Sequence, residues 1–128
     1  MLLLDTCTLL WLASDPALLS DRARQEISDA SDTLFFSAIS ALEIGIKAAK
    51  GKLVLPLPVD EWIAGVARHH GLKEIAITAR VAALATLLPP HHRDPADRIL
   101  LATAREADLL LLSPDAAFRR YDQIRCAW

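Results

Sequence analysis

The sequence predicts a three-layer α/β/α sandwich around a parallel five-stranded sheet. Five short runs are apolar at successive positions, which is typical of strands that are buried on both faces. Longer segments with helical periodicity separate these runs, and this alternation favours parallel strands joined by helices. A single domain over residues 1–128 is expected, because the chain contains no linker, internal repeat or low-complexity tract.

In the first part of the chain, each of two apolar runs leads into a helical pattern. The expected elements, in order, are a strand at 2–4, helices at 6–13 and 20–30, a strand at 34–36 and a helix at 37–50. Ser37 is a good N-cap residue for the last of these helices, and Gly51 is a natural residue at its C-terminal end.

The second part of the chain begins with its one irregular stretch, 52–59, and then resumes the alternation. The expected elements are a helix at 59–70, a strand at 74–77, helices at 79–88 and 95–107, a strand at 108–112, a short helical segment at 115–120 and a strand at 124–128. Gly71 ends the first of these helices, and the pair Pro89-Pro90 stops the second.

Composition limits the classes of function. The net charge is −2, whereas a protein whose main task is to hold duplex nucleic acid is usually basic. A nuclease remains compatible, because bound metal ions supply positive charge. The only cysteines, Cys7 and Cys126, form no disulfide framework and are expected to be reduced core residues of a cytoplasmic protein. No membrane association is expected, because no apolar run approaches about 18 residues and the N-terminus lacks a basic region.

Four carboxylates are expected at one edge of the sheet, since ligands of open α/β sheets bind beyond the carboxyl ends of the strands. Asp5 follows the first strand directly, and Asp115 comes soon after the fourth. Asp97 lies in the first turn of the helix that leads into the fourth strand, so it starts from the same edge. Glu43 lies about 9 Å along a helix that also begins there.

Such a cluster favours a metal ion. Neighbouring carboxylates repel one another and raise each other's pKa unless a cation neutralises them. Oxygen ligands without paired Cys or His favour Mg²⁺ or Mn²⁺. An ion of this kind polarises a phosphodiester and activates a water for in-line attack. The sequence therefore predicts metal-dependent phosphodiester hydrolysis.

Each of these acids also has a purely structural interpretation. Asp5 is a good N-cap for the helix that follows it, and Asp115 suits the turn after Pro114. Glu43 has Lys47 four residues later, which is the favoured orientation for a surface ion pair. The joint pattern, rather than any one acid, favours a functional site.

The position of Glu43 relative to the buried face of the helix at 37–50 follows from the spacing of the apolar residues. Ile39, Leu42 and Ile46 are expected to mark its buried face, with Glu43 beside that face.

The stretch "PPHHRDPADR" offers two adjacent histidines and two aspartates. His91 and His92 are too close together to ligate one ion easily, and a solvated loop is expected there. Asp94 is expected to be an N-cap, with Pro95 in the first position of the helix and Asp97 in its first turn.

Four segments resemble the motif blocks of PIN domains, most of all those of the VapC-type toxins of bacterial toxin–antitoxin pairs. They are "LLLDTCTLLWL", "SAISALEIGIKAAKGKL", "DPADRILLATA" and "LLSPDAAF", and they have the order and spacing of the family over nearly the whole chain. The resemblance implies the sheet order 3-2-1-4-5 and an Mg²⁺- or Mn²⁺-dependent endoribonuclease. It also implies a homodimer that a cognate antitoxin holds inactive.

The resemblance assigns the family's acids to this chain one by one. The first falls on Asp5, the second on Glu43, the third on Asp97 and the fourth on Asp115, with Ser113 where the family has Thr or Ser. It implies that the first three hold a metal ion, that Asp115 supports it or a second ion, and that cleavage leaves a 5′-phosphate and a 3′-hydroxyl. Strands 1 and 4 would be neighbours, which sets Asp5 beside Asp115.

Supporting roles at this site are expected for Thr6, Ser113 and Asp94. The chain departs from the family at Ala96, where a Phe is common, which puts a packing contact in doubt rather than the site.

Contacts to RNA are expected from basic residues near this edge. The nearest candidates are Arg98 and Lys47, although Arg98 could instead pair with Asp94 or Asp97. Further candidates are Lys50, Lys52, Arg93, Arg119 and Arg120.

A surface for the antitoxin is expected on two apolar helices. The run at 9–12 and the helix at 37–50 are apolar on more than one side, which predicts a groove for an amphipathic antitoxin segment.

Two other functions remain open from the sequence. A phosphotransfer domain also has an Asp after its first strand, but Cys7 stands where phosphatases have a second Asp, and the last strand ends in Trp128 rather than leading to a Lys. A non-catalytic module that binds RNA or protein would be expected to have lost carboxylates.

Overall fold

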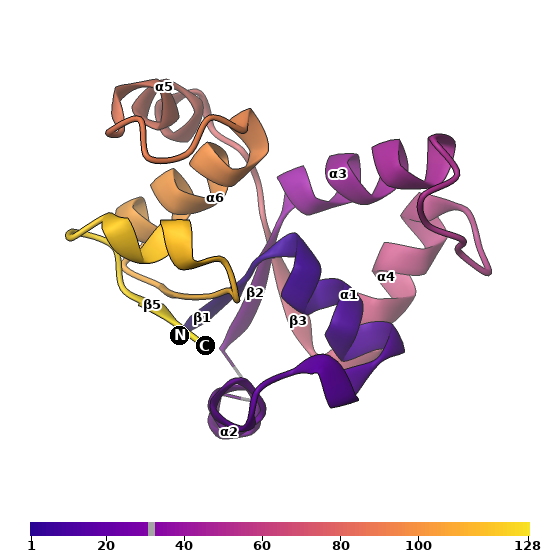
Figure 1. The fold of residues 1–128 in the computed structure, drawn as a ribbon. Helices are drawn as coiled ribbons and strands as arrows, with labels where there is room; N and C mark the ends of the chain where they lie inside the picture. Colours follow the sequence, from indigo (N-terminus) through magenta and orange to yellow (C-terminus); the bar gives the residue numbers. More distant parts are fainter. Residues whose placement is uncertain (31–32) are drawn as a thin grey trace.

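The computed structural model describes residues 1–30 and 33–128, and Figure 1 shows a central sheet with helices on both of its sides. The elements are β1 (Leu2–Leu4), α1 (Thr6–Ser14), η1 (Pro16–Leu18), α2 (Asp21–Asp29), β2 (Leu34–Ser37), α3 (Ala38–Ala49), α4 (Val59–His70), β3 (Leu72–Ile75), α5 (Ala79–Leu87), α6 (Pro95–Glu106), β4 (Leu110–Leu112), η2 (Ala116–Arg120) and β5 (Cys126–Ala127). Their bounds agree with the predicted ones to within two residues, and only the 3₁₀ helix η1 was not predicted.

The sheet has five parallel strands in the order β3-β2-β1-β4-β5, which confirms the predicted order. The central strand β1 pairs with β2 on one side and with β4 on the other. In this register Leu4 stands opposite both Phe36 and Leu112, so β1 and β4 end at the same level and β2 continues for one more residue. The residues that follow β1 and β4, Asp5 and Ser113, therefore lie next to each other.

Strands β1, β2 and β4 are largely buried on both faces, as their unbroken apolar runs predict, whereas the edge strand β3 exposes Lys73 and Glu74. Leu3 packs on one face with residues of α5, α6 and η2, whereas Leu2 and Leu4 pack on the other with residues of α1, α2 and α4. Helix α3 contributes to both sides, through Ile39 to the first core and through Ile44 to the second. Figure 1 shows α5 and α6 together on one side of the sheet and α1 with α4 on the other.

Strand β3 begins two residues earlier than predicted. Gly71 ends α4 in the left-handed conformation (φ 67°), and the chain enters the sheet directly, with Leu72 buried opposite Leu34. Ile77, which the sequence places in the strand, is 37% exposed beyond its end. In the described part of the chain, no helix is long and apolar enough to cross a membrane.

The predicted buried face of α3 is wrong in two of its three positions. Ile39 is buried, but Leu42 and Ile46 are 58% and 44% exposed. The buried positions are instead Ile39, Ser40 and Ile44. The polar Ser40 is accommodated inside because its hydroxyl is hydrogen-bonded to that of Thr6 on α1.

Candidate functional site

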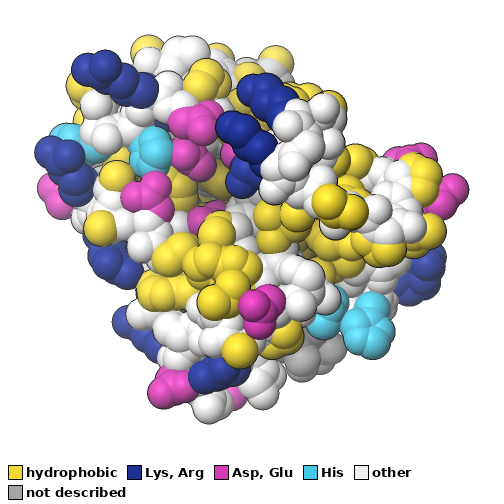
Figure 2. Space-filling view, turned by 45° about the vertical axis from the view of Figure 1, so that its right-hand side comes forward, with side chains coloured by type: hydrophobic (Ala, Val, Ile, Leu, Met, Phe, Trp, Pro, Cys, Tyr) yellow, Lys and Arg dark blue, Asp and Glu magenta, His cyan; other side chains and the backbone are white. Residues whose placement is uncertain are grey.

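A hollow of about 410 Å³ lies where the carboxyl ends of β1 and β4 meet α3 and α6. Its lining residues are Asp5, Thr6, Cys7, Glu43, Lys47, Asp94, Asp97, Pro114, Asp115 and Phe118. The structure thus brings together all four acids that the sequence singles out, from four separate segments of the chain. Figure 2 shows acidic side chains gathered on this face of the molecule, with basic and apolar side chains around them.

Asp5 is both a helix cap and a member of the hollow. One carboxylate oxygen accepts a hydrogen bond from the backbone N–H of Thr8 at 2.7 Å, which caps α1. The other accepts a hydrogen bond from the hydroxyl of Ser113 at 2.5 Å. The side chain is only 6% exposed, and this burial raises the pKa of Asp5 even though both hydrogen bonds act in the opposite direction.

Ser113 joins the ends of β1 and β4. Its hydroxyl donates to Asp5 and accepts from the backbone N–H of Asp115 at 3.1 Å. Asp115 in turn caps η2 through the N–H of Ala117 at 2.9 Å. Partial burial acts to raise the pKa of Asp115, but hydrogen bonds from His92 and Ala117 outweigh it, so the net pKa lies below its usual value.

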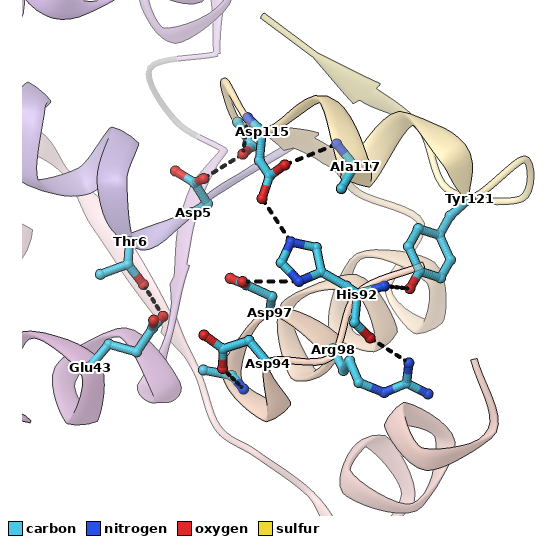
Figure 3. Close-up of polar contacts among 12 residues, drawn as sticks. Asp5, Thr6, Glu43, His92, Asp94, Asp97, Arg98, Asp115, Ala117 and Tyr121 are labelled. Atoms are coloured by element: carbon cyan, nitrogen blue, oxygen red, sulfur yellow. Dashed lines mark hydrogen bonds and ion pairs between the residues drawn. The ribbon is translucent and has the colours of Figure 1, made fainter. Parts of the chain in front are cut away.

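Glu43 is held towards the hollow by Thr6. The hydroxyl of Thr6 donates to a carboxylate oxygen of Glu43 at 2.5 Å, as Figure 3 shows. Among the described residues, the ion pairs do not include the one between Glu43 and Lys47 that the sequence leaves open. Burial raises the pKa of Glu43, and the negative charges of Asp94 and Asp5 add to this effect. Thr6 therefore has the supporting contact expected of it.

The N-terminus of α6 contributes two acids. Asp94 caps the helix by accepting from the N–H of Ala96 at 2.9 Å, and Pro95 takes the first helical position, as predicted. Asp97 follows one turn later. Burial raises the pKa of Asp97 to about 7, and the charges of Asp94, Glu43 and Asp115 also act to raise it.

Two groups of side chains are compact enough to hold an ion. Ligand atoms of Glu43, Asp94 and Asp97 lie within 4.8 Å of one another, and so do those of His92, Asp97 and Asp115. Asp97 belongs to both groups, while Asp5 belongs to neither. Apart from the imidazole of His92, the donors are carboxylate oxygens, so their chemistry fits a hard divalent cation, whose charge would relieve the repulsion between neighbouring carboxylates.

His92 lies in the loop before α6, as predicted, but the expectation that its side chain is solvated is wrong. Its imidazole is 16% exposed and approaches two site acids, with Nε2 2.7 Å from Oδ2 of Asp115 and Nδ1 3.4 Å from Oδ2 of Asp97. Its neighbour His91 is exposed, as expected. The spacing of the two histidines gives no sign of this contact, because a single imidazole lies between carboxylates from two different segments.

Arg98 is directed into the protein rather than towards Asp94 or Asp97. Its guanidinium donates to the backbone carbonyls of four residues at 2.7–3.1 Å. Those residues are Ala85, Leu88, Pro89 and His92. Because these bonds occupy four of the five N–H groups of an arginine, the predicted RNA contact of Arg98 has no support. Lys47, in contrast, is exposed and lines the hollow.

The comparisons with known proteins agree with this fold. The family model of the PIN domain matches residues 2–124. Ribonuclease VapC22 of Mycobacterium tuberculosis is 37% identical over 120 residues, which cover 93% of this chain and 90% of that protein.

Solved structures share the fold at lower sequence identity. A chain in the crystal structure of VapBC2 from Rickettsia felis bound to a promoter DNA fragment is 12% identical, with a TM-score of 0.71. A chain in DNA-bound VapBC from Salmonella typhimurium is 17% identical, also with a TM-score of 0.71. Each match covers 98% of this chain and 96% of the other. Taken together with the family model and the 37% identical ribonuclease, this fold means that the chain belongs to the PIN domain family.

Proposed function

We propose that this protein is a metal-dependent endoribonuclease and the toxin of a toxin–antitoxin pair. The observation that carries the proposal is the meeting of Asp5, Glu43, Asp97 and Asp115 around one hollow of a PIN domain. The 37% identity to a ribonuclease named VapC22 over most of both chains supports the same activity.

The acids of the hollow would hold Mg²⁺ or Mn²⁺. We take Asp97 as the central ligand, because its carboxylate is grouped with those of Glu43 and Asp94 on one side and, across the imidazole of His92, with that of Asp115 on the other. Asp5 faces the same hollow with the lone pairs that its two hydrogen bonds leave free. Such an ion supplies a Lewis acid for the phosphodiester and lowers the pKa of a water.

The chain's own residues fix these acids and approach the RNA. Thr6 orients Glu43, and Ser113 orients Asp5, so neither carboxylate has to be ordered when the ion binds. Lys47 lines the hollow and is exposed, so its ammonium would approach the phosphate of an RNA that entered there. With few basic residues nearby, target choice would depend on RNA shape or on unpaired loops.

An antitoxin would cover the groove beside the hollow. This groove of about 540 Å³ is lined on its apolar side by Ile39, Leu42 and Ile46 of α3 and by Pro95, Ala96 and Ile99 of α6. An amphipathic segment fits such a surface. The predicted contribution of the run at 9–12 is not supported, because Leu9 is buried and the other three residues of the run pack against the core. A homodimer and a cytoplasmic location remain proposals that rest on the resemblance and the composition.

Cleavage of RNA by the purified protein tests the activity. With Mn²⁺ or Mg²⁺ we expect endonucleolytic cleavage that EDTA stops. Asp97→Asn should reduce it by a factor of at least about 100, because the central ligand loses its charge. The matched control is Asp60→Asn, which removes an exposed acid from the first turn of α4.

Two results would count against the proposal. Cleavage by Asp97→Asn at the rate of the unaltered protein would show that a contaminating nuclease or a different site is responsible. Binding of Mn²⁺ and RNA without cleavage would favour a non-catalytic module instead.

A further inference from the structure

His92 occupies a position between two acids that come from different segments. Asp97 belongs to α6 and Asp115 precedes η2, and the imidazole lies between their carboxylates (Figure 3). Nε2 is 2.7 Å from Oδ2 of Asp115 and Nδ1 is 3.4 Å from Oδ2 of Asp97. At 2.7 Å, Nε2 is within hydrogen-bond distance of Asp115, and at 3.4 Å, Nδ1 is within ion-pair distance of Asp97, so an imidazolium would face both carboxylates with an N–H donor.

The position of His92 is itself fixed from three directions. Its backbone N–H donates to the hydroxyl of Tyr121 at 2.9 Å, and its carbonyl accepts from Arg98 at 3.0 Å. Its ring packs against that of Phe118, with the ring centres 5.0 Å apart. The hydroxyl of Tyr121 also donates to the carbonyl of Pro89, which ties the same loop a second time. The imidazole is therefore a rigid support rather than a mobile loop side chain.

His92 stands behind the two carboxylates rather than inside the hollow. Asp97, Asp115 and Phe118 line the hollow, whereas His92 is not among its lining residues. Each carboxylate thus turns one oxygen towards the imidazole and keeps its remaining lone pairs for the hollow. Groups that orient metal ligands in this way contribute about 10–100-fold to metal affinity.

We propose that His92 is a positioning residue that links Asp115 to Asp97 and thereby holds both carboxylates in the orientation that binds a divalent ion. This inference rests on the proposed function, because it assigns His92 to the same metal site. It adds a residue to the four acids that the family resemblance assigns to the site.

Mn²⁺ binding to the full-length protein, measured by calorimetry without RNA, tests the proposal. His92→Phe keeps an aromatic ring against Phe118 but removes both nitrogens, and it should weaken Mn²⁺ binding about 10–100-fold. His92→Gln should recover part of the affinity, since its amide can still donate to Asp115. The matched control is His69→Gln, which alters an exposed histidine in the last turn of α4 and should bind Mn²⁺ like the unaltered protein.

Thermal unfolding without metal separates positioning from folding. We expect His92→Phe to unfold within a few degrees of the unaltered protein, so that the loss is confined to Mn²⁺ affinity. If His92→Phe does not fold, His92→Asn replaces it, because the shorter amide does not reach Asp115. Weaker Mn²⁺ binding by His92→Asn supports the proposal, and unchanged Mn²⁺ binding overturns it.

The failures of the two proposals are distinguishable. Mn²⁺ binding by His92→Phe as tight as that of the unaltered protein overturns the role of His92 and leaves the metal site intact. Absence of Mn²⁺ binding by the unaltered protein overturns the metal site itself, and the positioning role with it.

Discussion

At the scale of single residues, the acids of the hollow serve the fold and the site at once. Asp5 caps α1, Asp94 caps α6 and Asp115 caps η2, so a structural role as a helix cap is confirmed for all three and is compatible with the proposed role in the site. A helix N-terminus stabilises negative charge, which lessens the cost of keeping these carboxylates close. Cap geometry therefore explains how three acids are positioned, but it does not by itself mark any of them as catalytic.

Asp97 gives the site a predicted pH dependence. Its pKa of about 7 lies above the value of 3.8 for the free side chain, so the metal-free fold retains a proton there that the unfolded chain has lost. The contribution of Asp97 to stability is therefore greatest below pH about 4 and is lost as the pH rises through about 7. Because a metal ligand must lose that proton, we expect Mn²⁺ to bind about tenfold more tightly at pH 8 than at pH 6.

Calorimetry at the two pH values measures this difference. The matched variant is Asp97→Asn, which binds Mn²⁺ more weakly and should lose this part of the pH dependence. The raised pKa values of Asp5 and Glu43 act in the same direction, so some dependence should survive in the variant. Equal affinity at pH 6 and pH 8 in the unaltered protein would contradict the role of Asp97 as a ligand.

The sequence revealed the acids of the site but not all of their supports. Acids after strand ends and in first helical turns follow from local pattern, because topology brings strand ends to one edge. The contacts of His92 with Asp97 and Asp115 depend on the path of a loop, and no spacing rule gives that path. Arg98 was assigned to RNA for the same reason, since a charge in a sequence does not indicate the carbonyls that it will meet.

At the scale of elements, the pattern of apolar residues predicts the bounds of helices and strands better than it predicts which face of a helix is buried. The pattern of α3 favours Leu42 and Ile46 as core, yet Ser40 and Ile44 are buried and Leu42 is exposed. The decisive contact is the hydrogen bond between Ser40 and Thr6, which lets a polar residue face inward. It joins residues 34 positions apart, so periodicity within α3 alone could not predict it.

The connection between α5 and α6 depends on one side chain. Arg98 binds four carbonyls between Ala85 and His92, which leaves those carbonyls partnered where the chain turns after Pro89-Pro90. We expect Arg98→Ala to lower the free energy of unfolding by about 2 kcal/mol, because several hydrogen bonds to a charged donor are lost. Arg98→Lys should not restore it, because an ammonium cannot reproduce the planar fork.

Urea denaturation measures the change, and Arg93→Ala is the matched control, since Arg93 is an exposed arginine of the same loop. Arg98→Ala should also weaken Mn²⁺ binding through the displaced His92. If Arg98→Ala is as stable as the unaltered protein, the four hydrogen bonds of Arg98 add little to the free energy of unfolding.

At the scale of the whole molecule, the sheet order determines where the site can form. With β1 between β2 and β4, the segments after β1 and β4 meet, and α3 and α6 bring Glu43 and Asp97 to the same edge. The residues alone predicted a parallel sheet, but the order 3-2-1-4-5 came only with the resemblance to PIN domains. Strand order depends on how the crossovers pack, and five short runs of similar composition do not encode it locally.

The same arrangement leaves an apolar groove next to the acidic hollow, and the two share Glu43, Lys47 and Asp94 in their walls. A partner seated in the groove would therefore reach the entrance of the site. The exposed Leu42 and Ile46 supply the apolar surface of the groove, and burying them would favour association. One segment that fills the groove could thus both bind the protein and exclude RNA.

The double variant Leu42→Glu/Ile46→Glu tests this coupling. Two charges in the groove should abolish co-purification with the small protein encoded beside the gene, because a bound partner would bury them unpaired. Both side chains already face solvent, so we expect the fold and the cleavage of RNA to persist. Co-expression should then be toxic for the double variant but not for Leu87→Glu, a control at a residue that is 77% exposed outside the groove. If the double variant remains bound and inhibited, the antitoxin must dock elsewhere, and the exposed face of α3 is left to a second copy of the chain or to RNA.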